Sequence, residues 1–139
     1  MTMKIQYFLL ALIGSLLPYI LNASIIENIH FTHIGLVDGL SHSTIFAINQ
    51  DKGGNLWFAT YDGVNKYDGY NFTVYRHQYM NPNSIASDIS RCIAVDDSDR
   101  IWVGTREGLS LYNRYKDAFS NYYYKKRGMN VAVTSIAPI

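Results

Sequence analysis

The sequence predicts an all-β fold of repeated four-stranded antiparallel units, and three observations lead to this prediction. A tract that runs from Asp51 to Tyr67 is written again from Asp96 to Tyr112, with equivalent residues 45 positions apart. Each copy contains short apolar, aromatic and β-branched runs, which favour strands. Turn sequences rich in Gly, Asp and Asn separate these runs. A period of roughly 20–50 residues indicates units that stack or close into a ring, and four short strands make one blade of a β-propeller.

In the first unit, turn sequences separate four predicted strands. Residues 43–50 alternate enough to form the first strand, and the apolar run 56–60 forms the second. The Asp-Gly pair at 62–63 favours a tight hairpin. A third strand therefore follows over 64–67, and a fourth covers 72–75.

The second unit repeats this order with weaker turns. Its strands are predicted over 89–95, 101–105, 108–112 and 119–123, with two residues inserted before the last. Helical heptads are absent from this region, which disfavours a helical solenoid. The sequence therefore predicts two blades of one design.

Two further segments resemble parts of a blade. Residues 31–34 resemble the fourth strands at 72–75 and 119–122, as expected for a latch strand that completes the last sheet of a ring. Residues 131–136 resemble the opening strand at 89–93. We therefore expect a truncated β-propeller fragment, with about two blades and the start of a third, preceded by an N-terminal signal helix.

The predicted organisation follows from these assignments. The boundaries are 1–23 for a signal peptide or uncleaved anchor, 24–42 for a lead-in with the latch strand, 43–80 for the first blade, 81–127 for the second blade, and 128–139 for the first strand of a third blade.

Length and charge restrict the classes of function. The chain has 139 residues, enough for one ordinary domain, whereas a propeller ring needs about 4–8 blades. The net charge is +1, from 12 basic and 11 acidic residues. A basic stripe that would indicate nucleic-acid binding is absent. The basic run 125–127 is interpreted as a solvated turn between units.

The N-terminus has the pattern of a targeting segment. Lys4 precedes an apolar stretch over 5–21, and Asn22, Ala23 and Ser24 follow it. A short apolar stretch after a basic start indicates a secretory signal peptide. The alternative is an uncleaved membrane anchor, because the stretch is close to the shortest helix that spans a bilayer. We expect an exported, periplasmic protein that contacts the membrane only through this segment.

Ten residues hold the same places in both copies and form the structural repeat motif. They are Asp51, Trp57, Thr60, Gly63, Tyr67, Asp96, Trp102, Thr105, Gly108 and Tyr112. The two tryptophans could stack on a sugar ring, but repetition favours packing between blades. Asp62 and Glu107 could serve as an acid–base pair. Repetition again favours a role in the turns, and we expect no catalytic residues.

Histidine and cysteine give little support for a metal site or a reactive centre. The histidines are His30, His33, His42 and His77. Two of them have a metal-like spacing, yet residues three apart on a strand point to opposite faces, and a cysteine partner is lacking. Cys92 is the single cysteine and is expected to be a buried, inert thiol. We expect neither a metal nor a cofactor.

Four segments of the chain resemble the two-component regulator propeller repeat family. The repeats at 56–67 and 101–112 resemble the repeat itself, and 31–41 and 81–85 resemble the lead-in and the link between units in the same family's sensors. Proteins with this start are similar to the hybrid two-component sensors of Bacteroides-type gut bacteria. The resemblance implies a periplasmic propeller that binds oligosaccharides, forms a homodimer in the full-length protein, and controls transcription of polysaccharide-utilisation genes.

The implied enzyme of such a protein is a histidine kinase, whose pattern is absent from this sequence. The resemblance therefore implies a binding segment that is not itself an enzyme, anchored in the inner membrane through the rest of the protein. Two alternatives stay open: a propeller enzyme similar to streptogramin lyase, and a non-catalytic scaffolding propeller.

Overall fold

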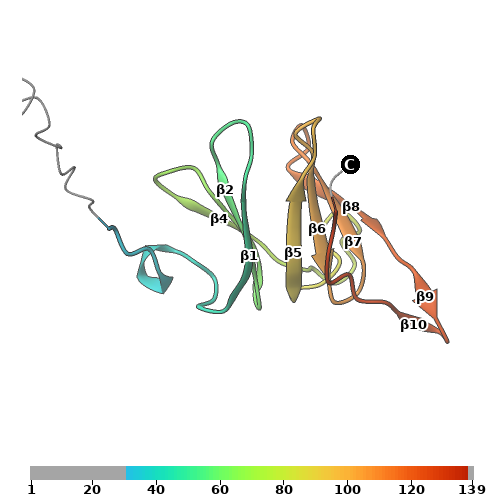
Figure 1. Cartoon of the computed structure of the whole chain (residues 1–139). Helices are drawn as coiled ribbons and strands as arrows, with labels where there is room; N and C mark the ends of the chain where they lie inside the picture. The colour runs from blue at the N-terminus through green and yellow to red at the C-terminus, as the bar shows by residue number, and fades with distance from the viewer. Residues whose placement is uncertain (1–30, 138–139) are drawn as a thin grey trace, which may run out of the picture. The chain divides into compact units, whose positions relative to one another are not determined.

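Two four-stranded antiparallel sheets make up most of the structure, a computed structural model that describes residues 31–137 (Figure 1). The strands of the first sheet are β1 (Ile45–Gln50), β2 (Leu56–Thr60), β3 (Gly63–Tyr67) and β4 (Phe72–Tyr75). Those of the second are β5 (Ser90–Val95), β6 (Ile101–Thr105), β7 (Leu109–Asn113) and β8 (Ala118–Tyr122). In each sheet, spatial order follows chain order. The predicted all-β fold with two four-stranded units is confirmed.

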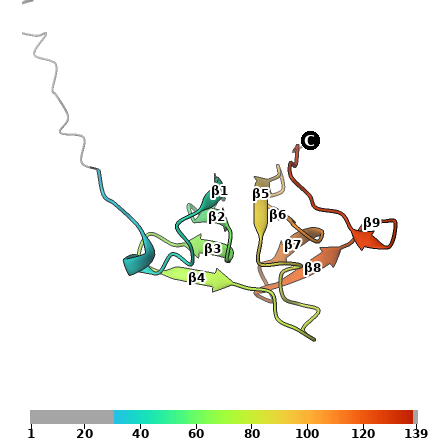
Figure 2. The same ribbon diagram turned by 90° about the horizontal axis from the view of Figure 1, so that it is seen from below.

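The two sheets lie side by side within one compact unit that begins at His33. Their first strands, β1 and β5, are neighbours, as Figures 1 and 2 show. A short 3-10 helix, η1 (Leu36–Asp38), precedes the first sheet, and a small hairpin of β9 (Lys125–Lys126) and β10 (Met129–Asn130) follows the second. The predicted signal segment 1–23 lies outside the described residues. Within residues 31–137, no helix is both long and apolar enough to cross a bilayer.

The turns place two kinds of residue at opposite ends of each sheet. One end, which we call the carboxylate end, carries the turns after β1 and β5, which begin at Asp51 and Asp96. Both turns are closed in the same way, since the amide of Asp51 donates to Asn55 at 3.0 Å and that of Asp96 to Arg100 at 3.1 Å. The opposite end, which we call the bulge end, carries the turns after β2 and β6 and the irregular starts of β1 and β5.

Two predicted strands do not form in this structure. Residues 31–34 and 131–137 have no strand assignment. A blade's first strand is held by hydrogen bonds to a second strand, as β1 is by β2, and no described strand pairs with 131–137. That segment instead lies against the second sheet, where the amide of Val133 donates to the Thr105 carbonyl at 2.9 Å.

The core lies between the two sheets. Its buried apolar side chains come from both of them and from the connection between β4 and β5, and are Trp57, Ala59, Val64, Ile85, Ile93, Ile101, Val103, Tyr112 and Phe119. Each sheet satisfies its own backbone hydrogen bonds, so these side chains provide most of what joins one sheet to the other. Burying apolar surface is the dominant favourable term in such a contact.

Gly63 is required by the geometry of the turn after β2. Its φ is +90°, a region that side chains disfavour, and a Cβ there would overlap the carbonyl oxygen of Tyr75. Gly54, in the turn after β1, has a similar φ of +86° but has open space around it. Substitution at Gly54 would therefore cost backbone strain alone, whereas substitution at Gly63 would add a steric clash.

Replacement of Gly63 by alanine is expected to destabilise the protein by about 3 kcal/mol or more, because conformational strain and overlap add. Gly54→Ala is the matched control, with an expected loss of about 1–2 kcal/mol from conformation alone. Urea unfolding followed by tryptophan fluorescence measures both losses. Equal losses at the two positions would contradict the steric role of Gly63.

Candidate functional site

The repeated Asp and Trp form one hydrogen-bonded pair in each sheet. The indole Nε1 of Trp57 donates to Asp51 Oδ2 at 2.9 Å, and that of Trp102 donates to Asp96 Oδ2 at 2.9 Å. The carboxylate at the turn thereby fixes the ring on the next strand. The repeat spacing places both residues correctly, but the sequence does not reveal that they bond to each other.

The repeated Thr and Gly close the turn at the bulge end. The hydroxyl of Thr60 donates to the Gly63 carbonyl at 2.9 Å, and that of Thr105 donates to the Gly108 carbonyl at 2.9 Å. These hydroxyls are fully buried. Because a buried hydroxyl needs a partner, the two threonines are used for structure.

Trp57 lies between the sheets and is 0% exposed. Its ring stacks on Tyr75 with 6.0 Å between centroids and meets the edge of Tyr112, from the second sheet, at 4.8 Å. A ring enclosed in this way cannot act as a platform for a sugar. Trp57 instead forms the centre of the seam between the two sheets.

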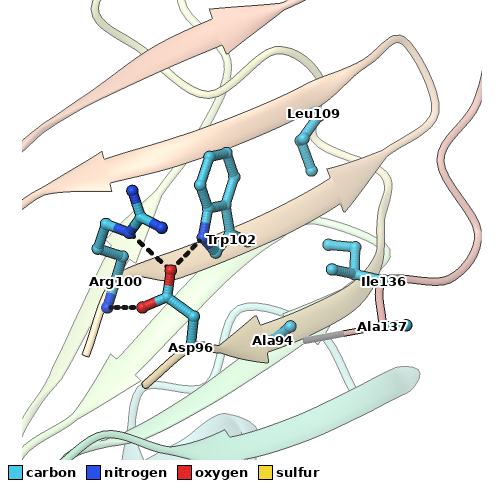
Figure 3. A pocket seen from close by; sticks show the side chains of 7 residues that line it. All are labelled: Ala94, Asp96, Arg100, Trp102, Leu109, Ile136 and Ala137. Carbon is cyan, nitrogen blue, oxygen red and sulfur yellow. Dashed lines mark hydrogen bonds and ion pairs between the residues drawn. The ribbon is translucent and has the colours of Figure 1, made fainter. Parts of the chain in front are cut away.

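Trp102 holds the equivalent place in the second sheet but is only partly buried. It lines a pocket of about 260 Å³, shown in Figure 3. The pocket is lined by Ala94, Asp96, Arg100, Trp102, Leu109, Ile136 and Ala137. Among the described residues, Ile136 and Ala137 are the ones outside the second sheet that line it. The pocket lies on the face of the second sheet that is equivalent to the face of the first sheet on which Tyr112 packs.

An ion-pair network ties the carboxylate end of one sheet to the other. The guanidinium of Arg114 donates to Asp51 Oδ2 at 3.1 Å and to Asp99 Oδ2 at 2.8 Å. Desolvation opposes ionisation of Asp51, but the hydrogen bonds from Trp57, Asn55 and Arg114 outweigh it and lower the pKa of its carboxyl. Asp51 therefore stays charged in a buried place, chiefly through hydrogen bonds from Trp57 and Asn55 of its own sheet and also through Arg114 of the neighbouring sheet.

A second polar group lies along the same seam. The hydroxyls of Tyr75 and Tyr112 each donate to Asp117 Oδ1 at 2.6 Å. Burial, followed by these contacts, raises the pKa of Tyr75, and the two hydrogen bonds lower the pKa of the Asp117 carboxyl. Both tyrosines remain neutral donors at physiological pH. The group is structural, since two neutral phenols and one carboxylate satisfy one another.

The bulge end presents side chains that differ between the repeats. Both first strands are irregular there, with register shifts between Ile45 and Ala47 and between Ser90 and Cys92. The residues at the shifts are Phe46 in the first sheet and Arg91 in the second. The exposed fraction of Phe46 is 39%, and Arg91 is exposed. Bulges often re-aim a side chain next to a functional site.

The turns after β2 and β6 add one residue each to the same end. The Tyr61 amide donates to the Thr44 carbonyl at 3.3 Å, and the equivalent Arg106 amide donates to the Ile89 carbonyl at 2.9 Å. Tyr61 is 50% exposed, and Arg106 is exposed. We take Phe46, Tyr61, Arg91 and Arg106 as the candidate functional site and call them the bulge-end cluster. Sequence reasoning missed these residues. A comparison of the two copies at positions where they differ could have found them.

The acidic residues of the same turns are in different situations. Asp62 accepts two hydrogen bonds from the Arg76 guanidinium, at 3.0 and 2.8 Å. Arg76 lowers the pKa of the Asp62 carboxyl, first through its hydrogen bonds and also through its charge. Glu107 is exposed. The Asp62 carboxylate is therefore held in an ion pair with Arg76.

The histidines and the cysteine take part in local contacts. The Thr44 amide donates to His42 Nδ1 at 2.9 Å, and His77 Nδ1 lies 2.9 Å from the Ile85 carbonyl oxygen. His30 lies outside the described residues. Cys92 is half-buried, and its burial raises the pKa of the thiol. Over residues 31–137, no group of three or more His, Cys, Asp or Glu side chains could hold a metal ion.

Comparison with known proteins identifies the repeats. Residues 39–62 and 84–107 match the two component regulator propeller. Both repeats of this chain are therefore similar to the repeat of that family. Each matched range covers the first hairpin of a sheet, from the lead-in to the turn after β2 or β6. It therefore contains the Asp–Trp pair and the buried threonine.

Two longer proteins are similar to this chain. Histidine kinase P4 of Formosa agariphila is 43% identical over 60 residues, which are 43% of this chain and 4% of that protein. The structure of the extracellular domain of the hybrid two component system BT3049 from B. thetaiotaomicron matches with a TM-score of 0.61 and 37% identity. That match covers 68% of this chain and 13% of the other. The chain thus spans a small part of the length of both.

Trp57→Ala is expected to cost about 3–5 kcal/mol of unfolding free energy, because it empties the seam. Trp102→Ala is the matched control within the same chain and is expected to cost about 2 kcal/mol less, because part of its ring already faces solvent. Urea unfolding at pH 7 followed by circular dichroism compares the two. A loss at Trp102 as large as that at Trp57 would refute the assignment of Trp57 as the centre of the seam.

Stability is expected to fall in acid because folding lowers the pKa of several aspartates. For Asp96 the hydrogen bond from Trp102 is the largest cause, and the pKa falls from 3.8 to about 2. A lowered pKa contributes stability above the unfolded value and loses it as the pH falls through the folded value. Stability should thus decline from about pH 4 towards pH 2.

The variant Asp96→Asn tests this dependence. It keeps an acceptor for the indole but cannot titrate, so its urea midpoint should fall less between pH 5 and pH 2.5 than that of the unchanged protein. Ser98→Asn, a nearby exposed substitution without a titrating group, is the control and should keep the full decline. An unchanged pH dependence in Asp96→Asn would rule out this contribution.

Proposed function

We propose that this chain is part of the extracytoplasmic sensing region of a two-component signal-transduction protein and that its ligand is an oligosaccharide. The observation that carries the proposal is the match to the extracellular domain of a hybrid two-component system, at 37% identity over 68% of this chain. The similarity to a histidine kinase supports the same assignment. In the proposal, the full-length protein is anchored in the inner membrane, forms a homodimer, and places these repeats in the periplasm.

The proposal gives this segment a binding role. The repeated polar side chains serve the fold: Asp accepts a hydrogen bond from an indole, and Thr donates one to the backbone. The side chains left at the surface of the bulge end include the aromatic rings of Phe46 and Tyr61. Aromatic side chains present a large apolar face, and tyrosine adds a hydroxyl that can form a hydrogen bond. Such a surface suits the C–H face of a sugar ring.

The output in this proposal is transcription of polysaccharide-utilisation genes. Ligand binding by a sensor changes the output only through a difference in affinity between two states of the protein. The seam offers one place for such a difference, because the two sheets are joined mainly by side chains. The proposal places catalysis in the histidine kinase of the full-length protein.

Loss of the gene should abolish induction of polysaccharide-degradation genes by at least one purified polysaccharide. Transcript levels in the disrupted strain and its parent, compared over a panel of plant, algal and host glycans, measure this effect. Complementation with the intact gene should restore the response. Unchanged induction on every glycan would contradict the proposed function.

Export provides an independent control for the same proposal. Alkaline phosphatase fused after residue 137 is active only outside the cytoplasm, so the fusion should be active with residues 1–23 present and inactive without them. Activity that does not depend on residues 1–23 would contradict the proposed location.

A further inference from the structure

We infer that the ligand of the bulge-end cluster is an anionic oligosaccharide, in which a sugar ring packs on Phe46 and Tyr61 and a carboxylate or sulfate group pairs with Arg91 and Arg106. The inference rests on the proposed function and adds the chemical class of the ligand. Four observations carry it: equivalent positions, changed chemistry, direct contact across the sheets, and the balance of charge.

The first observation is that the four residues occupy two equivalent pairs of positions. Phe46 and Arg91 are the residues at the register shifts of β1 and β5. Tyr61 and Arg106 are the first residues of the turns after β2 and β6, each anchored by its amide to the carbonyl that precedes the first strand. The backbone therefore presents all four side chains at the same end in the same way.

The second observation is the change of chemistry at these positions. The seam and turn residues of the motif keep their type in both repeats, as Trp57 and Trp102 do. At the bulge end an aromatic ring in the first repeat is replaced by a guanidinium in the second, twice. The motif residues, which serve the fold, keep their chemistry in both repeats. This difference indicates that these positions serve recognition.

The third observation is that the aromatic and cationic groups meet. The guanidinium carbon of Arg91 lies 5.0 Å from the ring centroid of Phe46, across the boundary between the sheets. The ring of Phe46 lies 6.5 Å from that of Tyr61, which in turn lies 5.6 Å from His42. A guanidinium over an aromatic face is attracted to it and is also held in place by it. One ligand could touch both sheets at this point.

The fourth observation concerns charge. Among the described residues, Arg91 and Arg106 form no ion pair, whereas Arg76 at the same end is paired with Asp62. Two further carboxylates are close in sequence: Glu107, next to Arg106, and Asp88, which accepts a hydrogen bond from the His77 amide at 2.6 Å. Two guanidinium groups without an ion pair, one of them over the Phe46 ring, favour an anion. Guanidinium matches the planar geometry of carboxylate and the oxygens of sulfate. A neutral sugar would leave both cations without a partner.

The test uses the whole chain and three defined trisaccharides. Trigalacturonate carries a carboxylate on each ring, galactotriose of the same linkage is its neutral counterpart, and a sulfated galactotriose carries sulfate instead. Nuclear magnetic resonance titration measures each Kd. At least one anionic trisaccharide should bind about tenfold or more tightly than the neutral one, equivalent to about 1.4 kcal/mol. Its affinity should fall as salt is raised.

Variants separate the cluster from the rest of the surface. Arg91→Gln and Arg106→Gln should each remove most of the preference for the anionic trisaccharide, and Phe46→Ala should weaken all three. Lys125→Gln removes the same charge from an exposed residue of β9 and should leave the preference intact. Thermal unfolding of each variant checks that the fold is kept.

Different failures have different meanings. Equal binding of neutral and anionic trisaccharides would overturn this inference and leave the proposed function standing. Binding of none of them, while cells still respond to a neutral glycan, would overturn the inference in the same way. Anionic binding that survives loss of both arginines would place the site elsewhere and also overturn it. Absence of any transcriptional response to glycans would remove the proposed function itself.

Discussion

The structure depends on an indole that is fixed by a carboxylate and enclosed between two sheets. Within each sheet the strands satisfy most of one another's backbone hydrogen bonds, so the sheets are joined mainly by side chains. Trp57 provides this junction, because Asp51 sets the orientation of its ring on one side and Tyr112 covers it on the other. The repeat keeps Asp and Trp at a constant spacing since neither residue can do this without the other. An unpaired carboxylate at this depth would be costly, and a free indole N–H would lose its partner.

The two ends of the sheets have different roles. At the carboxylate end, polar groups are saturated by one another, as Arg114 shows by bridging Asp51 and Asp99. At the bulge end, the Thr60 hydroxyl closes the turn by donating to the Gly63 carbonyl. The neighbouring side chain of Tyr61 is therefore not needed to close the turn and can vary. A rigid scaffold that carries variable side chains at the ends of its strands is a common way to build a recognition surface. In the two repeats, the buried motif residues are the same, whereas the exposed side chains at the bulge end differ.

Much of this could be read from the sequence, and the rest could not for physical reasons. The strand over 56–60 and the one over 72–75 were predicted with their observed bounds, because turn residues and apolar runs mark them clearly. The bulges at Phe46 and Arg91 were not predicted, since a register shift depends on the partner strand and leaves no local pattern. The strand predicted over 131–136 fails for a related reason: a strand is defined by its neighbour, and propensity alone does not supply one. The Asp51–Trp57 bond was missed because a turn residue explains Asp equally well.

The two repeated carboxylates, Asp51 and Asp96, show that the repeats are similar without being interchangeable. Asp51 receives its cation from Arg114 of the neighbouring sheet, whereas Asp96 receives one from Arg100 of its own turn, at 2.6 Å. Asn55 holds the place in the first repeat that Arg100 holds in the second. The first sheet therefore needs a basic residue on the surface that packs against it, and the second sheet does not. Since a wrong neighbour would leave Asp51 buried without its cation, this single exchange of Asn for Arg gives the two surfaces different requirements for a partner and helps to fix the order of the sheets.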